Sequence, residues 1–246
     1  MSAGSPAAGN PVLVALDVST GDEALRLADI LRGHVGGFKI GSQLFTSVGP
    51  SIVRTLVERG DRVFLDLKFH DIPNTVTGAV GAAADLGVWM VNVHASGGTA
   101  MMTAAREAAD AAAARGKTRP IVIAVTVLTS LDAASLSAVG VAKPPLAQVE
   151  HLAALTKRAG LDGVVASPQE TRAIRQACGA DFLIVTPGIR GGGAAAKADD
   201  QQRTLTPAEA LRAGSSYLVI GRPITAAADP RGAAERISDE IAAERA

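Results

Sequence analysis

Eight short apolar runs, separated by stretches with helical spacing, constrain the fold of this chain more than any other feature. The runs are rich in Val and Ile and show little polar alternation, which is typical of strands buried on both faces of a parallel sheet. The sequence therefore predicts eight parallel strands. They lie at residues 12–16, 37–40, 62–67, 90–94, 121–128, 163–166, 182–185 and 217–220.

The segments between these runs carry helix start and stop signals. Residues 167–170 (Ser-Pro-Gln-Glu) and 206–209 (Thr-Pro-Ala-Glu) each place a hydroxyl before Pro, with Glu as the third residue after the hydroxyl. This pattern predicts a capping box at the start of a helix. Gly179 and Gly214 are placed to end the two helices.

Eight strand-then-helix units in 246 residues predict a single-domain (β/α)8 TIM barrel. We assign the barrel to residues 12–246 and interpret residues 1–11, which are small and rich in Gly and Pro, as a disordered leader. A doubly wound open sheet is the alternative. The regular repetition of eight units, and the lack of a Gly-x-Gly-x-x-Gly motif after the first run, disfavour it.

Composition excludes several classes of partner. Lys plus Arg equals Asp plus Glu, at 24 each, so no excess charge indicates binding to nucleic acid or to an anionic membrane. Cys178 is the only cysteine and cannot form an intramolecular disulfide. No apolar run approaches the length of a membrane span, and no spacing of His, Asp and Glu suggests a metal site. We expect a cytoplasmic protein.

Charged residues follow the first three predicted strands. Asp17 ends the first strand, Lys39 lies near the end of the second, and Asp66, Lys68 and Asp71 end or follow the third. Active sites of such barrels lie at these carboxyl ends. Asp66 and Lys68 are two apart on a strand, so they share one face with Cα atoms about 6.6 Å apart.

A single Asp-x-Lys pair is more readily explained by an ordinary salt bridge at a strand end than by a catalytic role. Two lysines and three carboxylates on one rim exceed what packing requires, because unpaired charge is costly to bury. A substrate carboxylate placed beside Asp66 is repelled, whereas negative charge left on a ring carbon is favoured beside Lys68. The cluster therefore suits decarboxylation followed by protonation.

A second group of residues predicts a phosphate site. Residues 186–190 follow the seventh strand and residues 221–223 follow the eighth, and barrels commonly bind phosphate at these two loops. Arg190 and Arg222 can add bidentate contacts. Residues 191–200 are rich in Gly and Ala and suit a mobile lid.

The ten residues 66–75, Asp-Leu-Lys-Phe-His-Asp-Ile-Pro-Asn-Thr, resemble the signature of the orotidine 5′-monophosphate decarboxylase family. The resemblance extends over nearly the whole chain after the leader. Asp-x-Lys-x-x-Asp alone is shared with related sugar-phosphate enzymes, and the extension through Ile-Pro-Asn-Thr is more specific. The resemblance implies decarboxylation of orotidine 5′-monophosphate to uridine 5′-monophosphate and CO2 without any cofactor.

The resemblance also implies a role for each residue of the charged cluster. Lys68 would protonate C6 of the product carbanion, Asp66 would lie against the substrate carboxylate, and Lys39 and Asp71 would complete the array. Asp71, together with Thr75, would reach into the site of a neighbouring subunit. The homodimer would then be the catalytic unit.

The remaining substrate contacts are implied in the same way. Asp17 and Lys39 would hold the ribose hydroxyls, and Thr129 and Ser130 would lie at the pyrimidine. The phosphate end and its lid would consist of Arg190, Gln201, Gly221 and Arg222, with the choice of Gln201 over Gln202 resting on the Asp200-Gln201 pair alone.

Two other functions compete with this interpretation. A Mg²⁺-dependent sugar-phosphate decarboxylase or aldolase of the same barrel superfamily would share the shorter motif. A barrel that binds a nucleotide phosphate but has lost catalysis would keep only the phosphate loops. The intact Asp66, Lys68 and Asp71 argue against the second of these.

Overall fold

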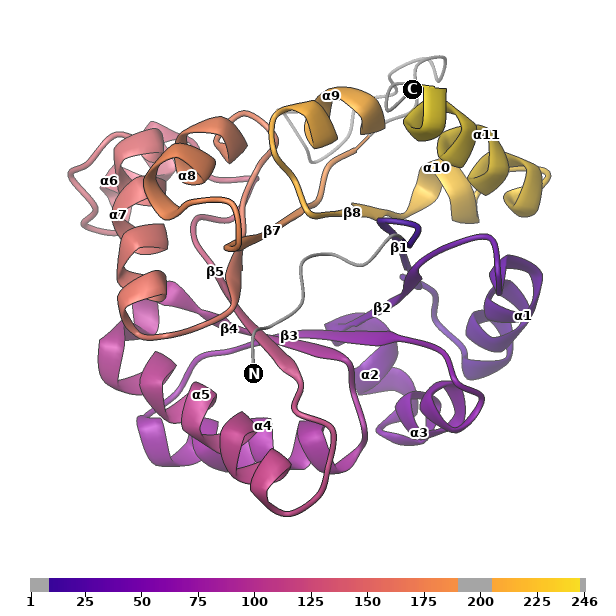
Figure 1. Ribbon diagram of the computed structural model, residues 1–246, viewed down its shortest axis with the longest axis horizontal. Coiled ribbons are helices and arrows are strands. Elements are labelled where there is room, and N and C mark those ends of the chain that lie inside the picture. Colours follow the sequence, from indigo (N-terminus) through magenta and orange to yellow (C-terminus); the bar gives the residue numbers. More distant parts are fainter. Residues whose placement is uncertain (1–8, 190–204, 244–246) are drawn as a thin grey trace.

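Eight parallel strands close into one barrel, with neighbouring strands paired in chain order and β8 paired with β1. The computed structural model describes residues 9–189 and 205–243. The predicted (β/α)8 barrel is therefore confirmed (Figure 1). The strands are β1 (Val12–Ala15), β2 (Gly37–Gly41), β3 (Val63–Phe69), β4 (Met90–His94), β5 (Ile121–Val125), β6 (Gly163–Val165), β7 (Leu183–Thr186) and β8 (Tyr217–Ile220).

Helices surround the barrel on the outside (Figure 1). In α1, Thr20 caps the first turn by accepting a hydrogen bond from the backbone N–H of Glu23, and Leu27 and Leu31 lie on the buried face. The helices are α1 (Gly21–Leu31), α2 (Ser42–Val48), α3 (Ser51–Glu58), α4 (Pro73–Asp85), the 3-10 turn η1 (Ala95–Gly97), α5 (Gly98–Ala114), α6 (Ala133–Ala138), α7 (Pro145–Arg158), α8 (Thr171–Cys178), α9 (Pro207–Arg212), α10 (Arg222–Thr225) and α11 (Pro230–Ala243).

Side chains fill the interior of the barrel. Leu13, Phe64, Ile123 and Val185 come from β1, β3, β5 and β7 and pack together with Met90 of β4. Layers contributed by alternate strands are the usual filling of a TIM barrel. Because this layer blocks the interior, a ligand site has to lie at one end of the barrel.

Of the two helix starts predicted from capping boxes, one is confirmed. The capping box at Thr206 and Glu209 is present and begins α9, as predicted. The same motif at Ser167 is only half formed, because Glu170 accepts from the Ser167 N–H but the buried Ser167 hydroxyl has no partner among the described residues. Residues 168–170 form a turn, so α8 begins at Thr171, later than predicted.

The predicted fifth strand, at residues 121–128, is too long by three residues. Its pairing with β6 ends at Thr126, whose backbone N–H and hydroxyl both donate to the carbonyl of Val165. Beyond this point the chain turns into the loop that carries Thr129 and Ser130. The third strand is longer than predicted and continues to Phe69.

Asn10 and Pro11, which precede β1, contact the barrel. The Asn10 side chain accepts a hydrogen bond from the Val12 N–H at 2.9 Å and donates to the His34 carbonyl at 2.8 Å and the Ser238 hydroxyl at 3.0 Å. Pro11 is buried. The predicted leader, residues 1–11, thus includes residues that contact the barrel, while residues 1–8 lie outside the described part of the chain.

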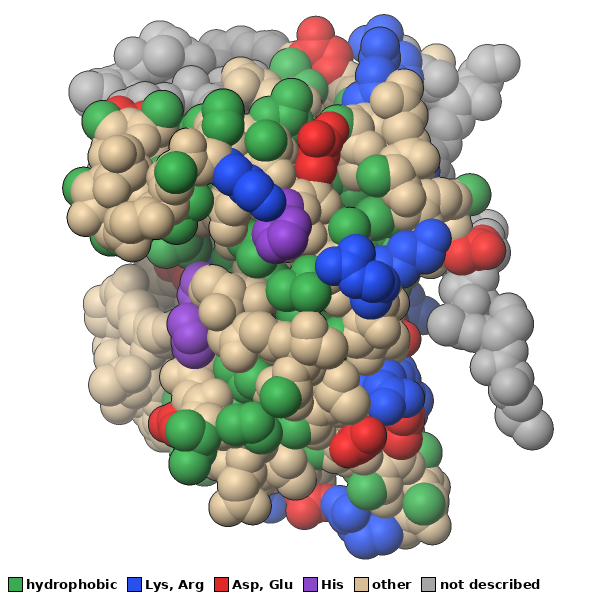
Figure 2. All heavy atoms as spheres, turned by 90° about the vertical axis from the view of Figure 1, so that its left-hand side faces the viewer, with side chains coloured by type: hydrophobic (Ala, Val, Ile, Leu, Met, Phe, Trp, Pro, Cys, Tyr) green, Lys and Arg blue, Asp and Glu red, His purple; other side chains and the backbone are tan. Residues whose placement is uncertain are grey.

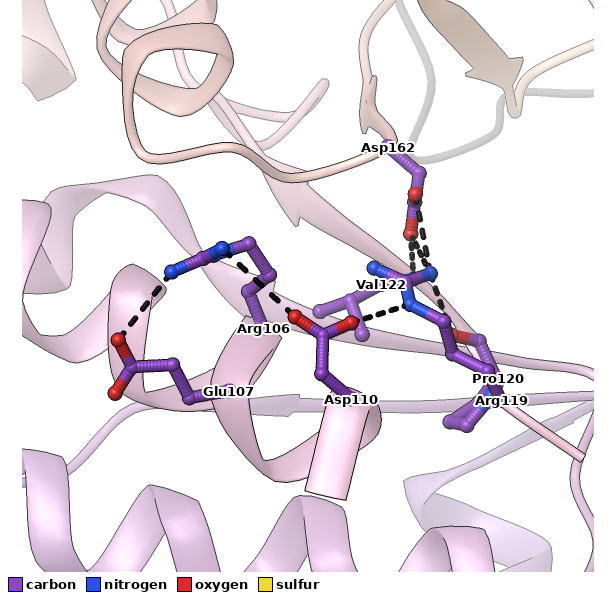
Figure 3. A network of polar contacts seen from close by, with 7 residues as sticks. All are labelled: Arg106, Glu107, Asp110, Arg119, Pro120, Val122 and Asp162. Carbon is purple, nitrogen blue, oxygen red and sulfur yellow. Dashed lines mark hydrogen bonds and ion pairs between the residues drawn. The ribbon is translucent and has the colours of Figure 1, made fainter. Parts of the chain in front are cut away.

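A polar network connects α5 to the starts of β5 and β6 (Figure 3). Arg119 donates to Asp110 at 2.7 Å and to both oxygens of Asp162 at 2.9 and 3.1 Å. Asp162 also accepts from the Val122 N–H at 2.7 Å. The network lies at the amino ends of the strands, opposite the end where the sequence predicts the active site.

The surface agrees with the balanced composition. On the face that Figure 2 shows, basic and acidic side chains are interspersed with apolar ones. Among the helices described, none is both long enough and apolar enough to cross a membrane.

Candidate active site

Lys39 connects two carboxylates at the carboxyl ends of β1, β2 and β3. Its Nζ lies 3.0 Å from Asp17 Oδ1 and 3.4 Å from Asp66 Oδ2. The register of the barrel creates this arrangement, because Ala15 pairs with Lys39 and Gly41 pairs with Asp66. The Lys39 side chain is only 9% exposed, whereas the Asp17 side chain is 56% exposed. The row of charges thus extends from the barrel interior to solvent.

Lys68 continues the row on the other side of Asp66. Lys68 Nζ lies 2.7 Å from Asp66 Oδ1, and the same oxygen accepts a hydrogen bond from Asn92 Nδ2 at 2.7 Å. Both oxygens of Asp66 therefore face cations, and one of them also accepts from a neutral amide. The charge of the largely buried Asp66 side chain is thus balanced from two sides.

The backbone at Lys68 departs from regular strand geometry. Its φ is +53°, the only positive φ of a non-glycine residue in the described chain. The pairing of β3 with β4 shifts between Leu65 and Phe69, and the Lys68 N–H donates to Asn92 Oδ1 at 2.8 Å. The prediction of a regular strand through Asp66 and Lys68 was wrong in this detail, because a bulge brings the two side chains together.

Gly41 provides the space that the Lys39 ammonium occupies. A Cβ atom at this position would lie 2.9 Å from Lys39 Nζ and 3.3 Å from Asp17 Oδ1. Its φ of −94° and ψ of 179° are open to any residue, so the requirement for glycine here is steric rather than conformational.

Two histidines lie beside the charged row. The rings of His70 and His94 are 5.6 Å apart between centroids. Burial lowers the pKa of His94, and the nearby His70 and Lys68 lower it further. A neutral His94 adds no positive charge to the row.

Four other predicted site residues follow the carboxyl ends of β3 and β5. Asp71 is exposed and accepts a hydrogen bond from the Ile72 N–H, and Thr75 is exposed in the first turn of α4. Thr129 and Ser130 lie in the loop after β5, half-buried and exposed respectively. Side-chain contacts join Asp17, Lys39, Asp66 and Lys68 into one cluster.

The predicted phosphate end follows β8. Gly221 lies next to the end of β1, since a Cβ atom on it would lie 3.5 Å from Ala15 Cβ. Arg222 is exposed and begins α10, with Pro223 in its first turn. Arg190, Gln201, Gln202 and the predicted lid at residues 191–200 lie outside the described residues.

Sequence reasoning missed Asn92 and Gly41. Asn92 is the only polar residue inside the apolar run Met-Val-Asn-Val, and a lone amide within a strand buried on both faces is a usable signal. Gly41, by contrast, is unremarkable in sequence. In the described ranges, no group of three or more His, Cys, Asp or Glu residues is arranged to hold a metal ion.

The fold and site together define a class of protein. Converging lysines and carboxylates at the carboxyl ends of the strands are typical of a (β/α)8-barrel enzyme whose active site lies at the barrel mouth. A model of the orotidine 5′-phosphate decarboxylase / HUMPS family matches residues 10–237. The chain belongs to this family.

Individual relatives are similar over nearly their full length. The chain is 56% identical to the orotidine 5′-phosphate decarboxylase of Moorella thermoacetica over 232 residues, which cover 94% of this chain and 91% of the relative. The corresponding protein of Photobacterium profundum is 54% identical, with 94% and 98% covered. The crystal structure of orotidine 5′-phosphate decarboxylase from Lactobacillus acidophilus superposes with a TM-score of 0.83 at 38% identity, covering 94% of this chain and 99% of that one.

Proposed function

We propose that this enzyme is a carboxy-lyase that converts orotidine 5′-monophosphate to uridine 5′-monophosphate and CO2, the last step of pyrimidine nucleotide synthesis. The observation that carries the proposal is the row Lys39, Asp66, Lys68 at the barrel mouth, in a chain that belongs to this family. The relatives' names favour this reaction over that of a Mg²⁺-dependent sugar-phosphate enzyme.

The charge order supports the proposed chemistry. Asp66 lies between two ammonium groups, and its negative charge repels a substrate carboxylate placed beside it. When the bond between C6 and the carboxylate breaks, CO2 leaves and the electron pair stays on C6. Lys68 then donates its Nζ proton to C6 and regains a proton from solvent. Negative charge thus develops where a cation is already positioned.

The proposed substrate contacts follow the rim of the barrel. Asp17 and Lys39 hold the ribose hydroxyls, and Thr129 and Ser130 contact the pyrimidine. Gly221 and Arg222 bind the phosphate with Arg190 and Gln201. Gly221 lies beside the end of β1, the strand that precedes Asp17. This supports a phosphate bound at Gly221 next to a ribose bound at Asp17. Remote phosphate contacts can then favour the transition state.

A homodimer forms the complete site in this proposal. Asp71 and Thr75 of each subunit reach the charged row of the other and complete it. The exposure of both residues leaves them accessible to a second subunit, which supports this arrangement.

The reaction is proposed to need no cofactor, because Lys68 itself stabilises and protonates the carbanion. The direct test is the change in pyrimidine absorbance on adding orotidine 5′-monophosphate to the purified enzyme. We expect turnover that survives exhaustive EDTA treatment. No absorbance change would refute the reaction, and activity lost to EDTA and restored by Mg²⁺ would refute the cofactor-free mechanism.

A further inference from the structure

Asn92 is fully buried in β4, and both of its polar atoms contact the residues at the centre of the charged row. Its Nδ2 donates to Asp66 Oδ1 at 2.7 Å, and its Oδ1 accepts from the Lys68 N–H at 2.8 Å. We propose that Asn92 is a positioning residue for decarboxylation, which fixes the Lys68 backbone and orients the Asp66 carboxylate. This inference rests on the proposed function.

The strand pairing explains why an amide is needed at this position. Leu65 pairs with Val91 and Phe69 pairs with Val93, so residues 66–68 stand opposite Asn92 alone. Such a bulge leaves backbone groups without ladder partners. The Asn92 side chain takes the place of the missing ladder acceptor by binding the N–H of Lys68.

The same hydrogen bond stabilises an unfavourable backbone conformation. Lys68 has a φ of +53°, and a non-glycine residue in this region is strained and persists only where surrounding contacts offset the strain. The bulge returns the Lys68 side chain to Asp66 at 2.7 Å. Releasing the backbone would therefore move the proposed proton donor relative to the carboxylate.

The NH2 group of the Asn92 amide contacts the Asp66 carboxylate. Asp66 Oδ1 accepts from both Lys68 Nζ and Asn92 Nδ2. A neutral donor stabilises the carboxylate without adding a cation that would compete for the substrate. Asn supplies one donor and one acceptor, whereas an ionised Asp supplies acceptors only and Leu supplies neither.

Asn92→Asp separates these roles from simple packing, because Asp has nearly the same shape. When ionised, Asp at position 92 still accepts from the Lys68 N–H but repels Asp66; when protonated, it can again donate to Asp66. Two adjacent carboxylates hold a shared proton with a raised pKa. Activity of this variant should therefore depend on pH in a way that wild-type activity does not.

The experiment compares kcat and KM of wild type, Asn92→Asp and Asn92→Leu across pH. At about pH 8 we expect kcat of Asn92→Asp to be roughly 100-fold below wild type, as for a small misplacement of catalytic groups, with a smaller change in KM. At about pH 5.5 the deficit should shrink by roughly tenfold as the shared proton is bound. Asn92→Leu should show a large deficit at every pH.

Asn10→Asp is the matched control, because Asn10 makes the same kind of contacts at the opposite end of the barrel. Its kcat and pH profile should match those of wild type. Circular dichroism at each pH establishes whether the variants are folded. If Asn92→Leu does not fold, the pH dependence of Asn92→Asp alone tests the positioning role.

Wild-type turnover is measured first. Inactive wild type would refute the proposed function. Active wild type, with Asn92→Asp either unimpaired or impaired equally at every pH, would refute the positioning role alone.

Discussion

Lys39 and Asp66 lie on neighbouring strands, and the ammonium nitrogen of Lys39 is 3.4 Å from Asp66 Oδ2. Because Asp66 Oδ1 also meets Lys68 Nζ at 2.7 Å, the carboxylate lies between two cations. Removing either lysine would leave the largely buried Asp66 carboxylate with one cation instead of two. Burying a charge with fewer partners is costly.

Lys68→Ala should abolish measurable turnover while leaving the fold and the binding of uridine 5′-monophosphate intact. A general acid contributes about 10²- to 10⁴-fold to rate, and the variant also loses the cation beside the carbanion. Turnover is measured by pyrimidine absorbance and binding by calorimetry. Lys117→Ala, at an exposed position after α5, is the control and should behave like wild type. Near-normal turnover by Lys68→Ala would contradict its role as proton donor.

Mixing inactive Lys68→Ala with inactive Asp71→Ala should regenerate activity if each site takes Asp71 from the partner subunit. In a hybrid dimer, one site carries both substitutions and the other carries neither. With random exchange half of the dimers are hybrids, so about a quarter of wild-type activity should appear. Subunit exchange is checked by mass spectrometry of the intact dimers. Exchange without recovered activity would argue against shared sites.

The barrel and the charged cluster are predictable from the sequence because both depend on local patterns. Val- and Ile-rich runs mark strands buried on both faces, and the barrel topology then collects Asp17, Lys39, Asp66 and Lys68 at strand ends. Once the barrel topology is known, the position of these four residues at one end of the barrel follows from their places in the strands.

The bulge at Lys68 is not predictable in the same way. Nothing in the residues Asp-Leu-Lys-Phe favours a left-handed lysine, because the conformation is held by Asn92 from another strand. The failed helix start at Ser167 has a similar cause, since its hydroxyl is buried by packing rather than directed at the backbone of the helix. Long-range contacts overrode local propensity at both places.

Gly41→Ala should impair catalysis more than stability. The added methyl group would lie 2.9 Å from Lys39 Nζ, the flexible end of a side chain, so Lys39 can move but leaves its position between Asp17 and Asp66. We expect kcat/KM to fall by roughly 10- to 100-fold. Gly21→Ala, where the Cβ meets only Val48 at 3.4 Å, is the control. Unchanged kcat/KM in Gly41→Ala would show that Lys39 tolerates displacement.

His94 should make the folded state less stable in acid. The pKa of His94 is lowered in the folded protein, chiefly by burial. At pH values between the unfolded-state pKa of about 6.5 and the lower folded-state pKa, the unfolded chain therefore binds more protons than the folded protein. Stability then rises with pH across this window and is lost on acidification. When the pH is lowered from about 7 to about 5, the Tm of His94→Gln should fall less than the Tm of wild type. His151→Gln, at an exposed position, should follow wild type.

Asp162→Ala should lower stability without lowering kcat, because Asp162 lies at the amino ends of the strands, where conserved roles in barrels are structural. Its carboxylate is 13% exposed and accepts from the Arg119 side chain and from the Val122 N–H (Figure 3). Removing it takes one carboxylate from Arg119, which keeps Asp110, and the acceptor from the Val122 N–H, at a cost of about 1–3 kcal/mol. For a chain of this length each kcal/mol lowers Tm by roughly 2–4 °C.

The matched control for this variant is Asp85→Ala, which removes an ion pair with Arg115 whose side chains are 58% and 53% exposed. Exposed pairs contribute about 0–1 kcal/mol, so Tm should change little. Thermal unfolding and steady-state kinetics on the same samples separate the two ends of the barrel. A fall in kcat of Asp162→Ala at a temperature where it is fully folded would mean that the network at the amino ends also positions the catalytic cluster.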